Sequence, residues 1–156
     1  MKKGFALLIC FALLFGCAAA DQAVALPESR YVIDVPDDMA YSAPENGDDG
    51  VQAYISDSME MDYLSYSLEN AAALGLSANM QETVEKLAAS GFDARLYGIN
   101  GVEMIVYRMT DQTDGAPGIG YVFADGDRII EVMFWYASQD AAELSQKIME
   151  TIRIAE

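Results

Sequence analysis

The sequence contains no histidine, and its only two cysteines lie within the first 17 of its 156 residues. The lack of histidine excludes histidine-based catalytic triads, histidine-ligated zinc and imidazole pH switches. Basic residues are scarce as well, with nine Lys and Arg against 25 Asp and Glu and a net charge of −16. Because proteins bind nucleic acid mainly through Lys and Arg that neutralise phosphates, this charge argues against a nucleic-acid partner.

The first residues have the three-part pattern of an export signal. Lys2 and Lys3 precede an uncharged, apolar run over residues 4–15, and small residues follow at 16–20. As a helix this run would be about 18 Å long, too short to cross the ~30 Å hydrocarbon core of a bilayer. We therefore expect residues 1–16 to be a signal peptide and not a permanent membrane span.

The end of this signal, Leu14-Phe15-Gly16-Cys17, resembles the lipobox of bacterial lipoproteins. In that family the cysteine is acylated and becomes the new N-terminus. The resemblance implies that Cys17 carries acyl chains, that these chains alone contact the membrane, and that the protein lies on the exported face of a bacterial cell membrane. Residues 18–20 are all Ala and offer a competing cleavage site, so secretion after cleavage behind Ala20 is the alternative.

The mature chain is strongly anionic and free of disulfides. Without Lys2 and Lys3, seven basic residues remain against 25 acidic ones, a net charge of −18. An apolar fraction of 53% is too high for disorder, and about 140 residues can bury a core without cysteine crosslinks. Such a surface is repelled by anionic lipid headgroups and favours a protein partner of basic character.

After a lipidated N-terminus and flexible tether over residues 17–29, one α+β domain is expected over residues 30–156. Apolar runs predict strands over 31–35, 51–55 and 62–66. Asn79 followed by Glu82 is typical of a helix N-terminus, and Gly91 suits its end.

Two turn signals predict consecutive hairpins in the second half of the domain. Asn100-Gly101 joins apolar runs over 92–99 and 102–109, and Asp125-Gly126 joins 118–124 to 128–136. Apart from Glu131, residues 129–136 are apolar on both faces, so this strand is expected at the centre of a covered sheet. Ser138 then caps a closing helix.

This order of elements predicts an antiparallel meandering sheet of about six to seven strands with two main helices packed on it. The order, a first strand ended by Pro36, and the final Thr151-Ile152-Arg153-Ile154 resemble the PsbP-like fold of exported and lumenal proteins. Members of that family usually serve as binding or assembly factors, so the resemblance implies a non-catalytic role. The histidine that plant members use near a metal has no counterpart here, and no site residue is carried over.

Aromatic and methionine residues suggest a contact surface. Tyr54, Tyr63 and Tyr66 are expected at alternating positions of adjacent strands, where they form either a cross-strand ladder or a ligand platform. Met59 and Met61 flank Glu60 in an expected loop, where exposed methionines would make an adaptable contact surface and buried ones would fill the core. These five residues are the candidate ligand or partner surface.

Acidic residues cluster twice, at Asp57, Glu60 and Asp62 and at Glu45, Asp48 and Asp49. Carboxylate oxygens suit Ca²⁺, but the second cluster fails the EF-hand pattern because Gly47 occupies its third position. Solvated acidic turns are the simpler interpretation, and no metal or cofactor is assigned.

The sequence predicts a membrane-anchored lipoprotein that acts as a binding or assembly module at the cell envelope and is not an enzyme. Two alternatives remain: a saccharide- or cell-wall-binding domain that uses the tyrosine-rich strands, and a carboxylate-based hydrolase. No catalytic residue is assigned, because the common nucleophile and base pairings are missing.

Overall fold

The structure is a computed structural model that describes residues 21–43, 51–111 and 115–156. The described residues form an α+β fold of two antiparallel sheets and three helices, in agreement with the predicted class. The larger sheet contains, in spatial order, β3 (Ala40–Ser42), β4 (Gln52–Ile55), β5 (Met59–Ser67), β9 (Arg128–Tyr136), β8 (Pro117–Asp125), β7 (Val102–Thr110) and β6 (Asp93–Ile99). The smaller sheet contains β1 (Asp21–Ala25), β2 (Tyr31–Pro36) and β10 (Arg153–Ile154). The helices are α1 (Leu68–Ala73), α2 (Met80–Ala89) and α3 (Gln139–Met149).

Local sequence signals account for most element boundaries. The Asn79 side chain accepts a hydrogen bond from the Glu82 amide at 3.2 Å and starts α2, as predicted. Asn100 and Gly101 both have positive φ and close the β6–β7 hairpin. β9 lies between β5 and β8, so the strand predicted to be central is central.

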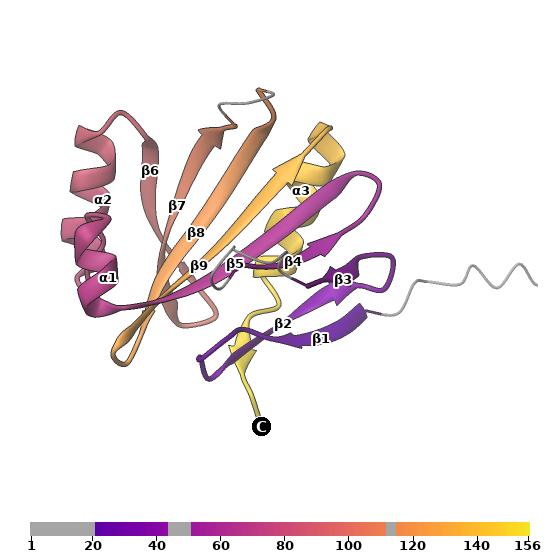
Figure 1. Cartoon of the computed structure of the whole chain (residues 1–156), viewed down its shortest axis with the longest axis horizontal. Helices are drawn as coiled ribbons and strands as arrows, with labels where there is room; N and C mark the ends of the chain where they lie inside the picture. The colour runs from indigo at the N-terminus through magenta and orange to yellow at the C-terminus, as the bar shows by residue number, and fades with distance from the viewer. Residues whose placement is uncertain (1–20, 44–50, 112–114) are drawn as a thin grey trace, which may run out of the picture.

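Each face of the seven-stranded sheet is covered by a different layer (Figure 1). The face that carries Met61, Tyr121 and Phe134, here called the core face, packs against the three-stranded sheet and α3. The face that carries Ile105 and Ile129, here called the helix face, packs against α1 and α2. Side chains alternate between the two faces along every strand, so neighbouring residues enter different environments.

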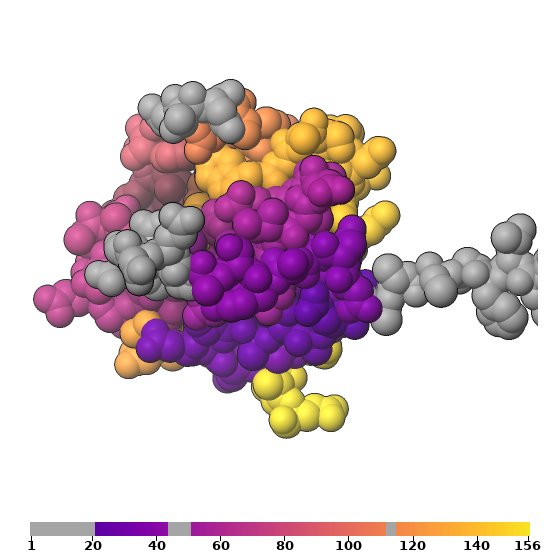
Figure 2. Space-filling model, turned by 45° about the vertical axis from the view of Figure 1, so that its right-hand side comes forward, coloured from indigo at the N-terminus to yellow at the C-terminus, as the bar shows by residue number. Residues whose placement is uncertain are grey.

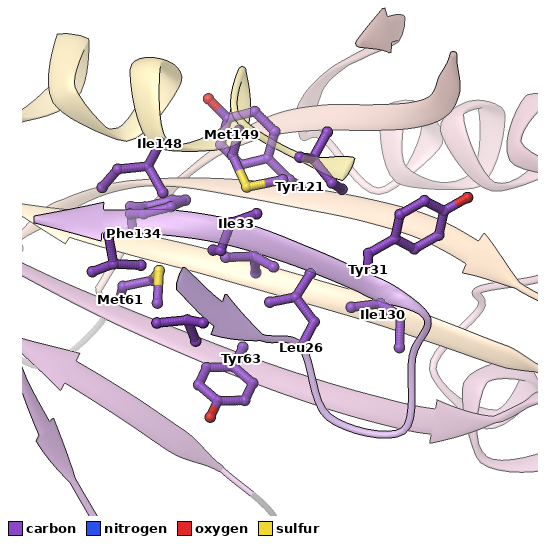
Figure 3. Packing of buried hydrophobic residues seen from close by; sticks show 14 of the residues in the cluster. Leu26, Tyr31, Ile33, Met61, Tyr63, Tyr121, Ile130, Phe134, Ile148 and Met149 are labelled. Atoms are coloured by element: carbon purple, nitrogen blue, oxygen red, sulfur yellow. The ribbon is translucent and has the colours of Figure 1, made fainter. Parts of the chain in front are cut away.

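The main apolar core lies between the two sheets and α3 (Figure 3). Ile33 of β2 and Leu26, which directly follows β1, pack in one cluster with Met61 and Phe134 of the large sheet and Ile148 of α3. All five side chains are 3% exposed or less. This burial supplies the bulk of the stability that a chain without disulfides needs.

The N-terminal boundary differs from the prediction. Residues 17–29 were expected to be a tether, but Asp21–Ala25 forms β1 and pairs along its full length with β2. The cause is non-local, because β1 obtains its hydrogen bonds from β2 and buries Val24 in the core. The tether prediction is therefore wrong for residues 21–25, and β2 belongs to a second sheet and not to the meander.

The C-terminal end also joins the small sheet. β10 pairs with β2, and the last residues project from the body beside the indigo strands in Figure 2. The sequence spacing predicts an inward stripe of Ala142, Leu144, Ile148 and Ile152 for the closing helix. Ile148 and Ile152 are buried as predicted, whereas Ala142 and Leu144 are half-buried and the first turns of α3 bury Ala141 and Ser145 instead.

Candidate functional site

The centre of the helix face holds a buried carboxylate. Glu131 of β9 is only 9% exposed. Its two oxygens accept hydrogen bonds from the Tyr66 hydroxyl at 2.8 Å and the Tyr107 hydroxyl at 2.5 Å. Burial and the neighbouring Glu131 carboxylate raise the pKa of both tyrosines above the usual range, so they remain protonated donors. The two hydroxyls make the burial of Glu131 tolerable.

Two glycines of β8 make room for aromatic rings on this face. A Cβ placed on Gly120 would lie 2.4 Å from the Tyr107 ring, and one placed on Gly118 would lie 2.7 Å from the Trp135 ring. Both rings therefore lie directly over backbone that carries no side chain. The Gly-x-Gly spacing within a strand is the sequence signal for this arrangement, and it points to the site only once the strand register is known.

Trp135 and Asp62 form a second hydrogen-bonded pair on the helix face. The Trp135 Nε1–H donates a hydrogen bond to Asp62 Oδ2 at 3.0 Å, and Glu60 lies directly opposite Trp135 across the β5–β9 pair. All three side chains are half-buried. Burial, and then the nearby Glu60 carboxylate, raise the pKa of Asp62 to about 6. We define Glu60, Asp62 and Trp135 as the acid–indole site.

The predicted contact residues do not form one surface. Met59, Met61 and Tyr63 are buried on the core face of β5, at 3%, 0% and 3% exposure, so the methionines fill the core. Tyr66 lies on the helix face, where it binds Glu131. Tyr54 is half-buried on β4 and belongs to the core-face side.

The tyrosine ladder that was one of the two alternatives is present, with a different third member. The rings of Tyr41 and Tyr54 are 5.5 Å apart, and those of Tyr54 and Tyr63 are 6.2 Å apart. Tyr63 also donates its hydroxyl to Gln52 at 2.6 Å. Desolvation raises the pKa of Tyr63 to about 12, as expected for a ring that packs and does not ionise.

The placement of the first acidic segment in a loop requires correction. Glu60 and Asp62 are not in a loop, because β5 already begins at Met59. Within residues 21–43, 51–111 and 115–156, no three carboxylates are grouped so that they could hold a metal ion. The cluster of Glu45, Asp48 and Asp49 lies outside the described residues.

Cys17 also lies outside the described residues, so its acylation stays a prediction. None of the helices in the described part of the chain has the length and apolar character to cross a bilayer.

Comparisons with solved protein structures identify the fold of this chain. The structure has the PsbP-like fold: it is similar to the solution structure of cyanobacterial PsbP from Synechocystis, with a TM-score of 0.56, 10% identity, and coverage of 88% of this chain and 94% of that one. A crystal structure from Bacteroides thetaiotaomicron is also similar, with a TM-score of 0.55 and 11% identity over 81% of this chain. This chain spans 46% of the Bacteroides protein. No family model and no curated protein matches the sequence.

Proposed function

We propose that this protein is a lipoprotein anchored through Cys17 at the exported face of a bacterial membrane, where its domain works as a non-catalytic binding or assembly module. The export signal, the lipobox-like segment and the PsbP-like fold support this proposal. The partner docks on the acid–indole site and presents Lys or Arg.

The observation that carries the proposal is the way Trp135 is held. Its indole lies over Gly118, Asp62 fixes its N–H, and Glu60 stands opposite. A half-buried indole beside two carboxylates suits a cationic side chain, which gains both charge pairing and contact with the ring face. The net charge of −18 in the mature chain accelerates the approach of a basic partner and deters acidic ones.

Site-specific photo-crosslinking in the producing cells tests this proposal. A photoreactive amino acid replaces Met133, which lies between Asp62 and Gly120 in the strand register. In a control protein it replaces Leu74, which directly follows α1 and is 60% exposed. We expect one crosslinked partner from position 133 and none from 74, with the product reduced by Asp62→Asn and by high salt. Equal products from both positions, or a product insensitive to Asp62→Asn, would contradict the proposal.

A saccharide of the cell wall is the second candidate for the same site. It is favoured by the flat Trp135 ring next to carboxylates, since sugars stack on such rings and hydrogen-bond to such oxygens. Trp135 is the only tryptophan of the chain, so its emission reports occupancy directly. Soluble peptidoglycan fragments should change that emission at any ionic strength, and an unchanged spectrum at millimolar fragment eliminates this candidate.

A further inference from the structure

The two edges of the seven-stranded sheet differ in length and exposure. β3 forms one edge and has three residues, whereas β6 forms the other and has seven. Within the described part of the chain β6 pairs with β7 alone, and Figure 1 shows it at the far edge of the sheet beside α2. An edge strand leaves alternate N–H and C=O groups without a strand partner, which makes it a template for an added strand.

β6 has only part of the usual protection of such an edge, namely two charged side chains and the packing of α2 beside it. It contains no proline and no lysine, and its two charged residues, Asp93 and Arg95, form an ion pair with each other at 3.4 Å. Leu96 and Tyr97 are 38% and 50% exposed, so apolar surface accompanies the free backbone groups on both faces of the strand. Natural proteins normally avoid this combination unless the edge is used.

A groove of about 240 Å³ runs beside β6 on the core face, where α3 ends its cover of the sheet. Its floor is apolar, with Val106 and Ile119, and Gln146 of α3 forms part of the opposite wall. Arg95, Arg108 and Tyr97 line the β6–β7 side. The volume suits one or two side chains of a bound segment and is below the 300–1,000 Å³ typical of small-molecule sites.

Charge selects what this groove accepts. Two of the seven basic residues of the mature chain, Arg95 and Arg108, line it against one carboxylate, Asp93, which lies opposite Arg108 in the β6–β7 register. Arg95 is paired only with its own neighbour Asp93, and among the described residues Arg108 forms no ion pair. The groove is thus a local cationic site on an otherwise anionic protein, and a carboxylate is the group that complements two adjacent guanidinium ions.

We propose that β6 accepts an extended segment of a partner protein as an eighth strand, with an Asp or Glu of that segment facing Arg95 and Arg108 and an apolar side chain in the groove. Main-chain hydrogen bonds to β6 supply affinity, and the arginines and groove supply specificity. A second copy of this chain is disfavoured as the occupant, because each copy carries a charge of −18. This inference does not depend on the acid–indole site.

A display library of linear peptides selected on the whole mature domain tests the inference. We expect enrichment of alternating apolar sequences with Asp or Glu at one position. Arg95→Ala combined with Arg108→Ala should lower the affinity of the domain for the selected peptides by about tenfold or more. The charge-matched control, Lys86→Ala combined with Lys147→Ala, and the Asp62→Asn variant should bind like the wild type.

Amide hydrogen exchange then locates the bound peptide. We expect new protection in residues 93–99, and loss of binding when alternate peptide amides are N-methylated. The inference is overturned if the wild-type domain enriches no peptides that the arginine double variant does not also enrich, or if binding survives N-methylation. It is also overturned if sedimentation shows that β6 pairs with a second copy of the chain.

Discussion

The two faces of the seven-stranded sheet are built by the same strands, and both pack apolar side chains, but only the helix face of β9 also carries hydrogen-bonded polar side chains. On the core face of β9, Ile130, Val132 and Phe134 are fully buried in an apolar cluster. On the helix face of the same strand, Glu131 and Trp135 form hydrogen bonds to side chains from β5 and β7. The apolar packing of the core face and the hydrogen bonds of the helix face are therefore separated by the period-two alternation of a strand. A substitution at one residue should leave the contacts of its neighbour on the other face intact.

The largest loss of stability should come from a substitution on the core face. Phe134→Ala removes a ring with 0% exposure, and we expect a loss of about 3–5 kcal/mol in the free energy of unfolding. Met133→Ala, at the adjacent and half-buried position, should cost only about 1 kcal/mol. Urea denaturation measures both, and similar losses would show that the two faces are not distinct.

The next effect should come from the glycine that supports Tyr107. Gly120→Ala forces the Tyr107 ring off the strand, and we expect a loss of about 1–3 kcal/mol. Gly98→Ala is the matched control, because a Cβ at that strand position has no atom within 4 Å. Thermal unfolding should separate the two variants, and equal stability would remove the role assigned to Gly120.

Removal of one donor to the buried carboxylate should have a smaller effect. Tyr107→Phe removes one hydroxyl donor and leaves Glu131 the hydrogen bond from Tyr66, and we expect a loss of about 1–2 kcal/mol in the free energy of unfolding. Tyr97→Phe changes a hydroxyl on a ring that is 50% exposed and should be neutral in the same chemical denaturation series. A neutral Tyr107→Phe would mean that water replaces the lost hydroxyl.

The smallest effect on the free energy of unfolding should come from Asp62. Its pH dependence runs opposite to that of most carboxylates, whose folded-state pKa is lowered. The folded-state pKa is about 6, above the ordinary value of 3.8, so the folded protein binds this proton more tightly than the unfolded chain does. The stability contributed by Asp62 is therefore present below pH ~4 and is lost as the pH rises toward 6.

Asp62→Asn should remove this dependence while retaining an acceptor for the indole N–H. Because the carboxylate is partly exposed to solvent, we expect a gain of only about 1 kcal/mol at pH 7.5, which disappears near pH 4. Asp57→Asn, at an exposed position, is the control and should show no such gain. A variant that is less stable than wild type at pH 7.5 would contradict the assignment.

Local signals were sufficient for much of the fold. The Asn79 cap, the Asn100-Gly101 turn and the nearly continuous apolar run of β9 each depend on neighbours in sequence, and each was placed correctly. The second hairpin was also predicted, but its turn lies one residue later than expected, at Gly126-Asp127, because Asp125 is still paired with Arg128. β1 was missed because its hydrogen bonds come from β2 and its short run of small residues has no strong strand signal.

The candidate site was predicted less well, and the reason is physical. Met59, Met61 and Tyr63 alternate with Glu60 and Asp62, which is the pattern of a half-buried strand, but the strand was expected to start only at Asp62. That error of three residues placed both methionines in a loop. The pairing of Trp135 with Asp62, and of its ring with Gly118, depends on the register of β9 with β5 and with β8, and β5 is distant from both in sequence.

The proposed function as a whole depends on the processing of Cys17, and the mass of the mature protein tests it most directly. The protein should be isolated from the membrane fraction of the cells that produce it, and its N-terminal peptide analysed by mass spectrometry. The proposal predicts a chain that begins at an acylated Cys17. A cytosolic chain that still begins at Met1, or a secreted chain that begins at Asp21 without lipid, would contradict the membrane-anchored module.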